Sequence, residues 1–307
     1  MKILISGHGA HAKKRIIPAL IKFKEIESID IVLRDSPKNK DLNIKYIDLN
    51  LSENKNRLYD YVIIASPPYA HMKNLEDLIN NSNNFIIEKP IFNKPENLTE
   101  DIFNTKYREK NIYESLMYLY HPIWLEVKKI FKEEKILQFS SSFTIPSLEA
   151  TNYRYRKEKG GGFTLDLGIY PISLFYNLIE EDFNIKNSKI HYHENHEVDI
   201  GGSLEIEYGD SISYKANWGL SEKYRNYLEI KTTKSVYNFP FIFTKSEDFE
   251  SYFIKTTDGE EEKINIGNFD QFYMMYENIF QQNTNNIKNN IPAKKTYNLL
   301  FDLLIES

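Results

Sequence analysis

The chain has 307 residues, no cysteine, and a formal net charge of −5 from 39 basic and 44 acidic side chains. Without cysteine the protein forms no disulfide, no thiolate nucleophile and no zinc–thiolate site, and its mild acidity argues against a nucleic-acid partner. No apolar run approaches the roughly 20 residues of a membrane span, and the apolar start is too short for a signal peptide. We therefore expect a cytoplasmic protein with no nucleic-acid or membrane partner, folded as two domains on a guide of about 150 residues each.

The first motif follows an apolar strand at residues 2–6. Gly7-His8-Gly9-Ala10-His11-Ala12 has the Gly-x-Gly-x-x-Gly/Ala spacing of a dinucleotide fingerprint, and a helical stretch comes next. Gly7 permits the tight turn, Gly9 lets the backbone approach a pyrophosphate, and Ala12 lets helix pack on strand. The candidate cofactor contacts here are Gly7, Gly9, Ala10, His11 and Ala12. Pro18 should begin a second helical piece, because an interior proline breaks a helix.

The choice of cofactor depends on the end of the second strand, at residues 28–33. An acid there binds the adenosine ribose, whereas an arginine accommodates a 2′-phosphate. Arg34 comes first, and Ser36 can help it to grip a phosphate, which favours NADP(H). In the alternative, Asp35 binds the ribose, Arg34 lies in solvent and the cofactor is NAD(H).

Two further strands each run into a polar turn. Residues 60–65 form a buried strand, and a helix with an apolar period follows at residues 69–80. His71 lies early in this helix, where it either caps or packs the helix or lines the cofactor cleft. The alternation of strand and helix predicts a doubly wound parallel sheet. A helix near residues 98–109 and a strand near residues 112–119 complete this Rossmann domain of residues 1–119.

Phe85-Ile86-Ile87 is a short buried strand, and Glu88-Lys89-Pro90 follows it directly. A charged pair at the end of a buried parallel strand lies where open α/β sheets bind their ligands. Desolvation lowers the pKa of a lysine, so a lysine held there can give a proton to a substrate near neutral pH, with Glu88 to orient or tune it. The alternative is an ordinary strand that ends in solvated charges.

From residue 120 to residue 307 the pattern becomes that of an α+β domain. A helix at residues 124–132 precedes a series of candidate strands, with hairpin turns near Gly209 and Gly259. The candidate strands are residues 137–145, 185–192, 202–208, 212–218, 227–232 and 252–255. Clustered antiparallel strands imply a large, mostly antiparallel open sheet, and one face of this sheet can form the bottom of a cleft. Helices at residues 269–281 and 294–306 should pack on this sheet or on the first domain.

The second glycine motif is Gly160-Gly161-Gly162, and the residues after it read as a helix start. Three glycines allow the backbone to crowd a ligand or a neighbouring strand. Asp166 and Tyr170 are four residues apart and share one helix face, and Pro171 should kink the helix just past Tyr170. A carboxylate and a phenol aimed at one point can serve acid–base catalysis. The alternative is a surface tyrosine with a nearby acid.

Together these blocks resemble the Gfo/Idh/MocA oxidoreductases almost end to end. The resemblance rests on Gly7 and Gly9, Ser66-Pro67 with His71, Glu88-Lys89-Pro90, and the three glycines that lead to Asp166-x-Gly168-x-Tyr170. Residues 113–122, 152–155, 198–202 and 224–227 are similar to the sugar 3-ketoreductase branch, which acts on nucleotide-linked deoxysugars. In departure from the family pattern, Ala12 replaces the third glycine, and Leu119 stands where many relatives have a basic residue.

The resemblance implies roles for particular residues. Lys89 would be the catalytic lysine at the nicotinamide, Tyr170 would protonate the sugar oxygen in place of the histidine of many relatives, and Asp166 would orient Lys89 or a substrate hydroxyl. The implied cofactor contacts are Ser66, Pro67, His71, Glu88 and Lys89, and the implied substrate contacts are His121, Tyr153, Arg154, Asp166 and Tyr170. Relatives often have the Lys89–Pro90 bond in cis and often form homodimers or homotetramers through the open sheet.

We therefore predict an enzyme that uses NADP(H) to reduce a keto group of a sugar, most simply a nucleotide-linked deoxysugar. One alternative is an NAD-dependent dehydrogenase that oxidises a sugar or polyol, and another is a sensor that binds dinucleotide without turnover. His191-Tyr192-His193-Glu194-Asn195-His196 superficially resembles a cluster of metal ligands. A solvated polar run between strand and loop is the simpler interpretation, so no metal is predicted.

Overall fold

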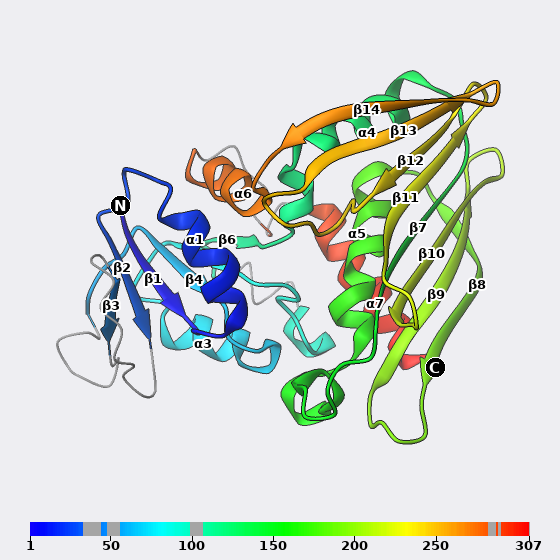
Figure 1. Cartoon of the computed structure of the whole chain (residues 1–307). Helices are drawn as coiled ribbons and strands as arrows, with labels where there is room; N and C mark the ends of the chain where they lie inside the picture. Colours follow the sequence, from blue (N-terminus) through cyan, green and yellow to red (C-terminus); the bar gives the residue numbers. More distant parts are fainter. Residues whose placement is uncertain (33–43, 48–55, 99–106, 282–286, 288–289, 307) are drawn as a thin grey trace. The chain divides into compact units, whose positions relative to one another are not determined.

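The protein is represented by a computed structural model that describes residues 1–32, 44–47, 56–98, 107–281, 287 and 290–306 (Figure 1). The chain divides into two units. The first comprises Met1–Leu116 and Met275–Ile291, and the second comprises Met117–Met274 and Pro292–Ser307. Within the described ranges, every helix is too short or too polar to span a bilayer.

The first unit contains a six-stranded sheet in the order β3-β2-β1-β4-β5-β6, and all of its pairings are parallel. The strands are β1 (Lys2–Ser6), β2 (Ser28–Val32), β3 (Ile44–Ile47), β4 (Tyr61–Ile64), β5 (Asn84–Ile87) and β6 (Asn111–Glu114). All four side chains of β4 are buried, as in a sheet covered on both faces. This strand order is that of doubly wound dinucleotide-binding sheets, which bind ligands beyond the carboxyl ends of the strands. The predicted fold of this region is confirmed.

Short helices connect these strands. A helical run after β1 consists of a π-helical turn, η1 (Ala12–Ile16), and then α1 (Ile17–Leu20), in which Pro18 lies in the first turn, as predicted. After β4 come the 3-10 turn η2 (Pro68–Ala70) and α3 (His71–Asp77), and η3 (Pro95–Leu98) follows β5. The helix predicted near residues 98–109 falls largely outside the described residues. The strand predicted at residues 112–119 is too long, because β6 ends at Glu114 and a 3-10 turn, η5 (Met117–Tyr120), follows.

The boundary between the units falls within α6 (Gln271–Phe280). The ring of Phe280 packs against Phe23 and Tyr61, at centroid distances of 5.2 and 4.7 Å. The Tyr61 hydroxyl also donates to the carbonyl of Ile279 at 3.4 Å. These contacts join the end of α6 to the parallel sheet of the first unit.

The second unit contains an eight-stranded sheet in the order β14-β13-β12-β11-β7-β10-β9-β8. Its strands are β7 (Ile136–Ile145), β8 (Phe183–Tyr192), β9 (Asp199–Tyr208), β10 (Ile212–Leu220), β11 (Arg225–Thr232), β12 (Val236–Pro240), β13 (Glu250–Thr257) and β14 (Glu260–Asn268). The β7–β10 pair is parallel and the other described pairs are antiparallel, which confirms the predicted class. Strands β12 and β14 were not predicted, since neither sequence shows a clear alternation of apolar and polar residues.

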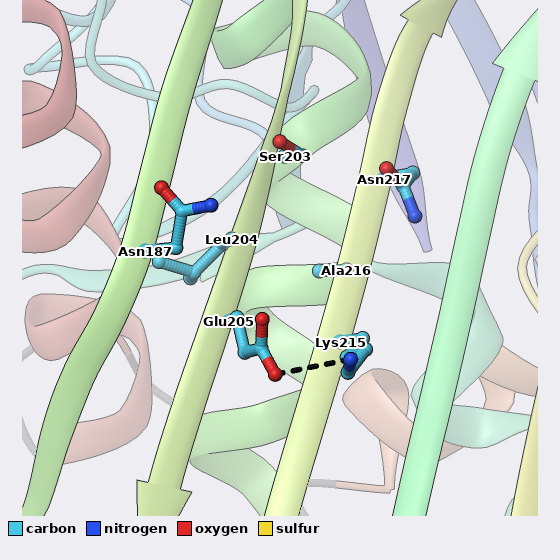
Figure 2. A pocket seen from close by; sticks show the side chains of 7 residues that line it. All are labelled: Asn187, Ser203, Leu204, Glu205, Lys215, Ala216 and Asn217. Carbon is cyan, nitrogen blue, oxygen red and sulfur yellow. Dashed lines mark ion pairs between the residues drawn. The ribbon is translucent and has the colours of Figure 1, made fainter.

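Helices α4 (Pro122–Glu133) and α5 (Ile169–Leu178), the latter preceded by the π-helical turn η8 (Thr164–Gly168), pack on one face of this sheet. The last helix, α7 (Ile291–Ile305), lies beside α5, where Lys295 Nζ is 6.0 Å from the centroid of the Tyr176 ring. On α5 the ring of Phe175 stacks on Tyr214 of β10 at 5.3 Å and lies 6.4 Å from Phe139 of β7. On the opposite face, polar side chains of three neighbouring strands border a shallow pocket of about 170 Å³ (Figure 2). Glu205 and Lys215 form an ion pair there, with 3.0 Å between Oε1 and Nζ.

Candidate functional site

The turn after β1 contains two glycines, Gly7 and Gly9, and there is free space next to Gly9. A Cβ at Gly9 would meet no atom within 4 Å, and Gly9, Ala10 and His11 are exposed. Gly7 differs, because its φ is +112° and a Cβ there would lie 2.6 Å from the backbone of Ala65 and Ser66. Gly7 therefore lets the turn after β1 pack on the turn after β4, while Gly9 leaves the space that a pyrophosphate needs to approach the backbone. These residues fit a dinucleotide.

Glu88 and Lys89 lie directly beyond β5, at the carboxyl edge of the parallel sheet. Glu88 is buried, Lys89 is half-buried, and the Lys89–Pro90 peptide bond is cis. The amide of Glu88 donates to the carbonyl of Ile64 at 2.9 Å, which ties this turn to β4. The structure thus places the charged pair at the sheet edge where the sequence predicted it.

Glu88 forms an ion pair with His11 of the glycine turn. The distance from Glu88 Oε1 to His11 Nε2 is 3.4 Å, long for a hydrogen bond but close enough for strong attraction. Burial is the largest single influence and opposes both charges. The charges and hydrogen bonds around the pair nevertheless leave the pKa of Glu88 lowered and the pKa of His11 raised. Lys89 and Ser115 also favour the ionised form of Glu88. The pair links two of the predicted cofactor contacts within the first unit.

His71 has no exposed surface. Its ring lies between two backbone carbonyl oxygens, with Nδ1 2.9 Å from that of Pro90 and Nε2 2.7 Å from that of Ser66. Asn74, one turn further along α3, donates from Nδ2 to the Ser66 hydroxyl at 2.8 Å. These contacts agree with the predicted packing alternative for His71, whereas its contact with the cofactor stays a prediction. The contact of Asn74 was not predicted from the sequence.

The glycine run of the second unit packs against the protein's own backbone. A Cβ at Gly161 would lie 2.5 Å from the carbonyl oxygen of Arg154 and 2.7 Å from that of Arg156, and one at Gly162 would lie 2.6 Å from Asp199 Oδ1. The amides of Gly161 and Gly162 donate to those same two carbonyls, at 2.9 Å each. The three glycines were predicted to let the backbone approach either a ligand or a neighbouring strand. At Gly161 and Gly162 the backbone approaches a neighbouring segment of the chain.

Asp199, at the start of β9, holds the beginning of the helix that carries Asp166 and Tyr170. Its Oδ2 accepts from the amides of Phe163 and Thr164, at 3.1 and 2.6 Å, and from the Thr164 hydroxyl at 2.6 Å. Trp218 Nε1 donates to the same hydroxyl at 3.0 Å. Burial raises the pKa of Asp199, and these hydrogen bonds act against that rise. No local pattern signals this contact, because the partners are 35 residues apart in the sequence.

Asp166 is bound by an arginine of its own unit. Arg154 Nε lies 2.6 Å from Asp166 Oδ2, and Arg154 Nη2 lies 3.5 Å from Oδ1. The guanidinium also stands over the ring of Tyr153, 4.8 Å from its centroid. Burial opposes the charge of Arg154, but Asp166, Tyr153 and Tyr170 together outweigh burial and raise the pKa of the guanidinium. Three predicted site residues are thus brought together, with the arginine fork turned towards a carboxylate.

Tyr170 lies in the first turn of α5 and is buried. Its hydroxyl lies 4.0 Å from the sulfur of Met117, and its ring packs edge-on to Phe143 at 4.9 Å and near Tyr118 at 5.9 Å. Pro171 is the third residue of α5, and the π-helical turn η8 runs directly into this helix. The kink expected just past Tyr170 stays a prediction.

His121 was predicted to contact substrate, and that role stays a prediction. It is 1% exposed, and its Nδ1 accepts from the amide of Ile123 at 3.1 Å as the N-cap of α4. Its Nε2 lies 3.3 Å from the Ser251 hydroxyl. Burial and then nearby Lys245 lower the pKa of His121 to about 3. In the described structure His121 is therefore a buried, neutral residue that caps α4.

Arg34, Asp35 and Ser36, the predicted determinants of cofactor choice, lie outside the described residues. His191 is at the end of β8, and His193 and His196 follow in the loop, with the His196 ring stacked on Tyr155 at 4.4 Å. Among the residues that the structure describes, no group of three or more His, Cys, Asp or Glu side chains is arranged to hold a metal ion.

Known proteins resemble the chain in both sequence and fold. A curated dTDP-3,4-didehydro-2,6-dideoxy-alpha-D-glucose 3-reductase of Saccharopolyspora spinosa is 22% identical over 238 residues, 75% of this chain and 71% of the relative. The crystal structure of KijD10, a 3-ketoreductase from Actinomadura kijaniata in complex with NADP and TDP-benzene, matches with a TM-score of 0.88 and 19% identity, over 99% of this chain and 97% of that one. An aldose-aldose oxidoreductase from Caulobacter crescentus matches with a TM-score of 0.79 and 12% identity, over 100% and 98%. At these identities the structural matches establish the fold.

Family profiles match both units of the chain. Residues 1–113 match the oxidoreductase family with an NAD-binding Rossmann fold, and residues 125–238 match the GFO/IDH/MocA C-terminal domain. The two matches together cover most of the sequence, and they agree with the parallel sheet of the first unit and the open sheet of the second. The chain therefore belongs to the Gfo/Idh/MocA family of NAD(P)-dependent oxidoreductases.

Proposed function

We propose that this protein is an NADP(H)-dependent oxidoreductase that reduces a keto group of a sugar, with nucleotide-linked deoxysugars as its substrate class. The main support is that the relative from Saccharopolyspora spinosa, similar over three-quarters of the chain, is a 3-reductase of a dTDP-linked dideoxy sugar. KijD10, which shares the fold over almost the whole chain, was solved with NADP and a TDP derivative. The described site residues are compatible with that chemistry.

The cofactor would be held by the open turn of the first unit. Gly9, Ala10 and His11 are exposed there, and the absence of a Cβ at Gly9 leaves room for phosphate oxygens near the backbone. When bound, the nicotinamide supplies the hydride. Arg34 would select NADP(H) through the 2′-phosphate, a role that rests on the sequence alone.

The protons of the reaction would come from Tyr170 and Lys89. In this proposal the Tyr170 hydroxyl gives its proton to the substrate oxygen, and the Lys89 ammonium polarises that oxygen or restores the proton. Asp166 is held by Arg154, which suggests that it orients the guanidinium rather than Lys89. Tyr153 and Arg154 would then present a fixed cation to the sugar or the diphosphate.

The direct test is Lys89→Ala. We expect turnover of a dTDP-linked keto sugar with NADPH to fall about a hundredfold or more, the usual worth of a positioned proton donor, while NADPH affinity changes little. Lys94→Ala, at an exposed lysine of the same segment, is the matched control. A Lys89→Ala enzyme with near-normal turnover would remove Lys89 from the chemistry.

A double-mutant cycle tests whether the two proton-handling residues act together. Tyr170→Phe removes only the hydroxyl, and Tyr176→Phe on the same helix is its control. If both residues act on one substrate oxygen, the double variant should be little slower than the slower single variant, because groups that act as a unit are not additive. Additive losses would show that they serve separate steps.

The alternative is an NAD-dependent dehydrogenase of a sugar or polyol. Titration with NADPH and NADH, before and after Arg34→Ala, separates the two possibilities. We expect the variant to lose affinity for NADPH and to keep its affinity for NADH. An unchanged NADPH affinity would contradict the role of Arg34, and an initial preference for NADH would favour the dehydrogenase.

We also propose that residues 120–307 form the substrate and oligomerisation domain, and residues 1–119 the cofactor domain. The open face of the eight-stranded sheet carries the Glu205–Lys215 ion pair (Figure 2). In the strand register, Ser140 and Glu229 continue the same row on the next two strands. Charges of alternating sign can meet their opposites when two copies pack about a twofold axis. Light scattering should show a homodimer or homotetramer that Lys215→Glu weakens. A monomeric wild type would contradict this.

A further inference from the structure

His71 joins two turns at the carboxyl edge of the parallel sheet. It opens α3, which follows β4, and its ring is completely buried. Nε2 lies 2.7 Å from the carbonyl oxygen of Ser66, in the turn after β4, and Nδ1 lies 2.9 Å from that of Pro90, in the turn after β5. Pro90 is the residue next to Lys89, so this single ring connects the backbone beside the predicted catalytic lysine to the neighbouring turn.

The two contacts require two donors. A backbone carbonyl oxygen only accepts hydrogen bonds, and a neutral imidazole carries a single N–H group. A neutral His71 would therefore bond to one carbonyl and point a nitrogen lone pair at the other from less than 3 Å. Turning the ring over would place carbon atoms against the carbonyls and would satisfy neither. The imidazolium, with both nitrogens protonated, satisfies both.

Charges around the ring act in both directions. Burial is the largest influence and, with Lys89, leaves the pKa of His71 lowered overall, although the two carbonyls and the Glu88 carboxylate raise it. The hydrogen-bond geometry stands against that balance, because a neutral ring would keep one lone pair pointed at a carbonyl oxygen less than 3 Å away. Glu88 is itself ionised, with a pKa lowered by His11 and Lys89 against the effect of burial. On α3, the side chain of Asn74 faces the Ser66 hydroxyl and is neutral. A buried carboxylate close to the ring is the counter-charge that a buried imidazolium needs.

We propose that His71 is held as an imidazolium in the folded protein and acts as a positioning residue that fixes the Lys89–Pro90 turn against the Ser66–Pro67 turn. The protonation state is a property of the first unit alone. The expected effect on turnover rests on the proposed function, since it assumes that Lys89 takes part in catalysis.

The protonation state can be measured without any enzyme assay. In the full-length protein labelled with 15N-histidine, two-bond 1H–15N correlations distinguish an imidazolium from each neutral tautomer. His71 should show two protonated nitrogens at pH 7.5, where a histidine with the ordinary pKa of about 6.5 is mostly neutral. Its signals are identified by their loss in His71→Gln, or by backbone-based assignment if that variant does not fold. A neutral tautomer at pH 7.5 would overturn the proposal.

The positioning role is tested by a split between binding and turnover. His71→Gln can donate from one nitrogen only, so one of the two turns should be released. We expect kcat per NADPH-binding site to fall at least about tenfold, because a displacement of about 1 Å can cost a hundredfold, while the KM of the sugar changes little. The control is His193→Gln, in an exposed loop of the second unit, which should leave both parameters unchanged.

The two measurements separate the possible failures. If wild type turns over no sugar, the proposed function fails and the NMR result still decides the state of His71. If His71→Gln lowers only the number of NADPH-binding sites and leaves kcat per site unchanged, the residue supports folding but does not position Lys89. That outcome would also overturn the proposal.

Discussion

The two glycine motifs of this chain are similar in sequence and differ in what they face. In the first unit, a Cβ at Gly9 would meet nothing within 4 Å, whereas in the second unit a Cβ at Gly161 would meet two backbone carbonyl oxygens within 2.7 Å. The first motif leaves room for a ligand, and the second is filled by the protein's own chain. A glycine in a binding motif therefore does not by itself mark a ligand contact; the atoms around the missing Cβ decide it.

The motifs also differ in how the helix after them is anchored. Each leads into a π-helical turn, Ala12–Ile16 or Thr164–Gly168, and then into an α-helix with proline in its first turn. The second helix start is held by a buried carboxylate, Asp199, with three short hydrogen bonds. The start of the first helix is tied to the sheet edge by the 3.4 Å ion pair between His11, which is half-exposed, and Glu88, which is buried. Mutations in the second glycine motif, which is filled by the chain itself, should therefore lower the free energy of unfolding. Mutations in the first motif, which is open, should instead weaken ligand binding.

Gly161→Ala should have the largest effect on stability. The added methyl group would meet the carbonyl oxygens of Arg154 and Arg156, and backbone atoms cannot swing aside as a flexible side chain can. We expect a loss of about 3 kcal/mol, at the upper end of what overpacking costs. Both tryptophans of the chain lie in the second unit, so their fluorescence during urea unfolding reports on this region. A variant as stable as wild type would mean that the turn at residues 153–156 moves freely.

Asp199→Ala should cost somewhat less, about 2 kcal/mol, because it leaves buried donors of Phe163 and Thr164 without an acceptor. Asp199→Asn is the matched control, since its carbonyl oxygen can still accept from an amide and it should recover part of the loss. The same fluorescence measurement applies. Equal stabilities of the Ala and Asn variants would show that hydrogen bonding at the helix start contributes nothing.

The sequence predicted the architecture well because both sheets rely on local patterns. Continuous apolar runs such as Tyr61–Ile64 gave the parallel strands, and alternation gave most strands of the second sheet. It missed β14, whose residues Glu260 to Lys263 are all exposed, because an edge strand without a buried face carries no apolar period. It placed Glu88, Lys89, Asp166 and Tyr170 on the right elements through their spacing from glycine and proline.

The roles of the histidines and of Asp166 were not predictable in the same way. His71 and His121 occupy motif positions, but both are buried. His71 binds a carbonyl of the turn after β5, and His121 caps its own helix and lies 3.3 Å from the distant Ser251 hydroxyl. Arg154 and Asp166 were assigned separately, and only the fold shows that they form a pair at 2.6 Å. The spacing of residues in a motif indicates which way a side chain points. The residue that it contacts is decided by tertiary packing, which the motif does not show.

Gly9→Ala should weaken dinucleotide binding without loss of stability. The methyl group would occupy the open space that the pyrophosphate needs, and we expect roughly tenfold weaker NADPH binding, equivalent to about 1.4 kcal/mol. Fluorescence titration with NADPH and the unfolding midpoint measured on the same sample give both quantities. If Gly9→Ala were destabilised as much as Gly161→Ala, the contrast between the open and the closed motif would disappear.

His11→Gln should have the smallest effect, and one that depends on pH. The pKa of His11 is raised above its ordinary 6.5, so its pairing stabilises the fold below pH 6.5 and fades as the pH rises through the folded-state pKa. The pKa of Glu88 is lowered below its ordinary 4.5, so the pair is complete between about pH 4.5 and pH 6.5. Because His11 is half-exposed, we expect His11→Gln to lose less than about 1 kcal/mol at pH 5.8 and almost nothing at pH 9, measured by urea unfolding.

The neighbouring His8 gives a control of opposite sign for that measurement. Burial and then Lys13 lower the pKa of His8 below 6.5, so protonation of His8 at pH 5.8 disfavours the folded state. His8→Gln should therefore gain stability relative to wild type as the pH falls from 9 to 5.8, whereas His11→Gln should lose it. A pH dependence of the same sign in both variants would mean that the general charge of the first unit, and not the pairing of His11 with Glu88, governs the open turn.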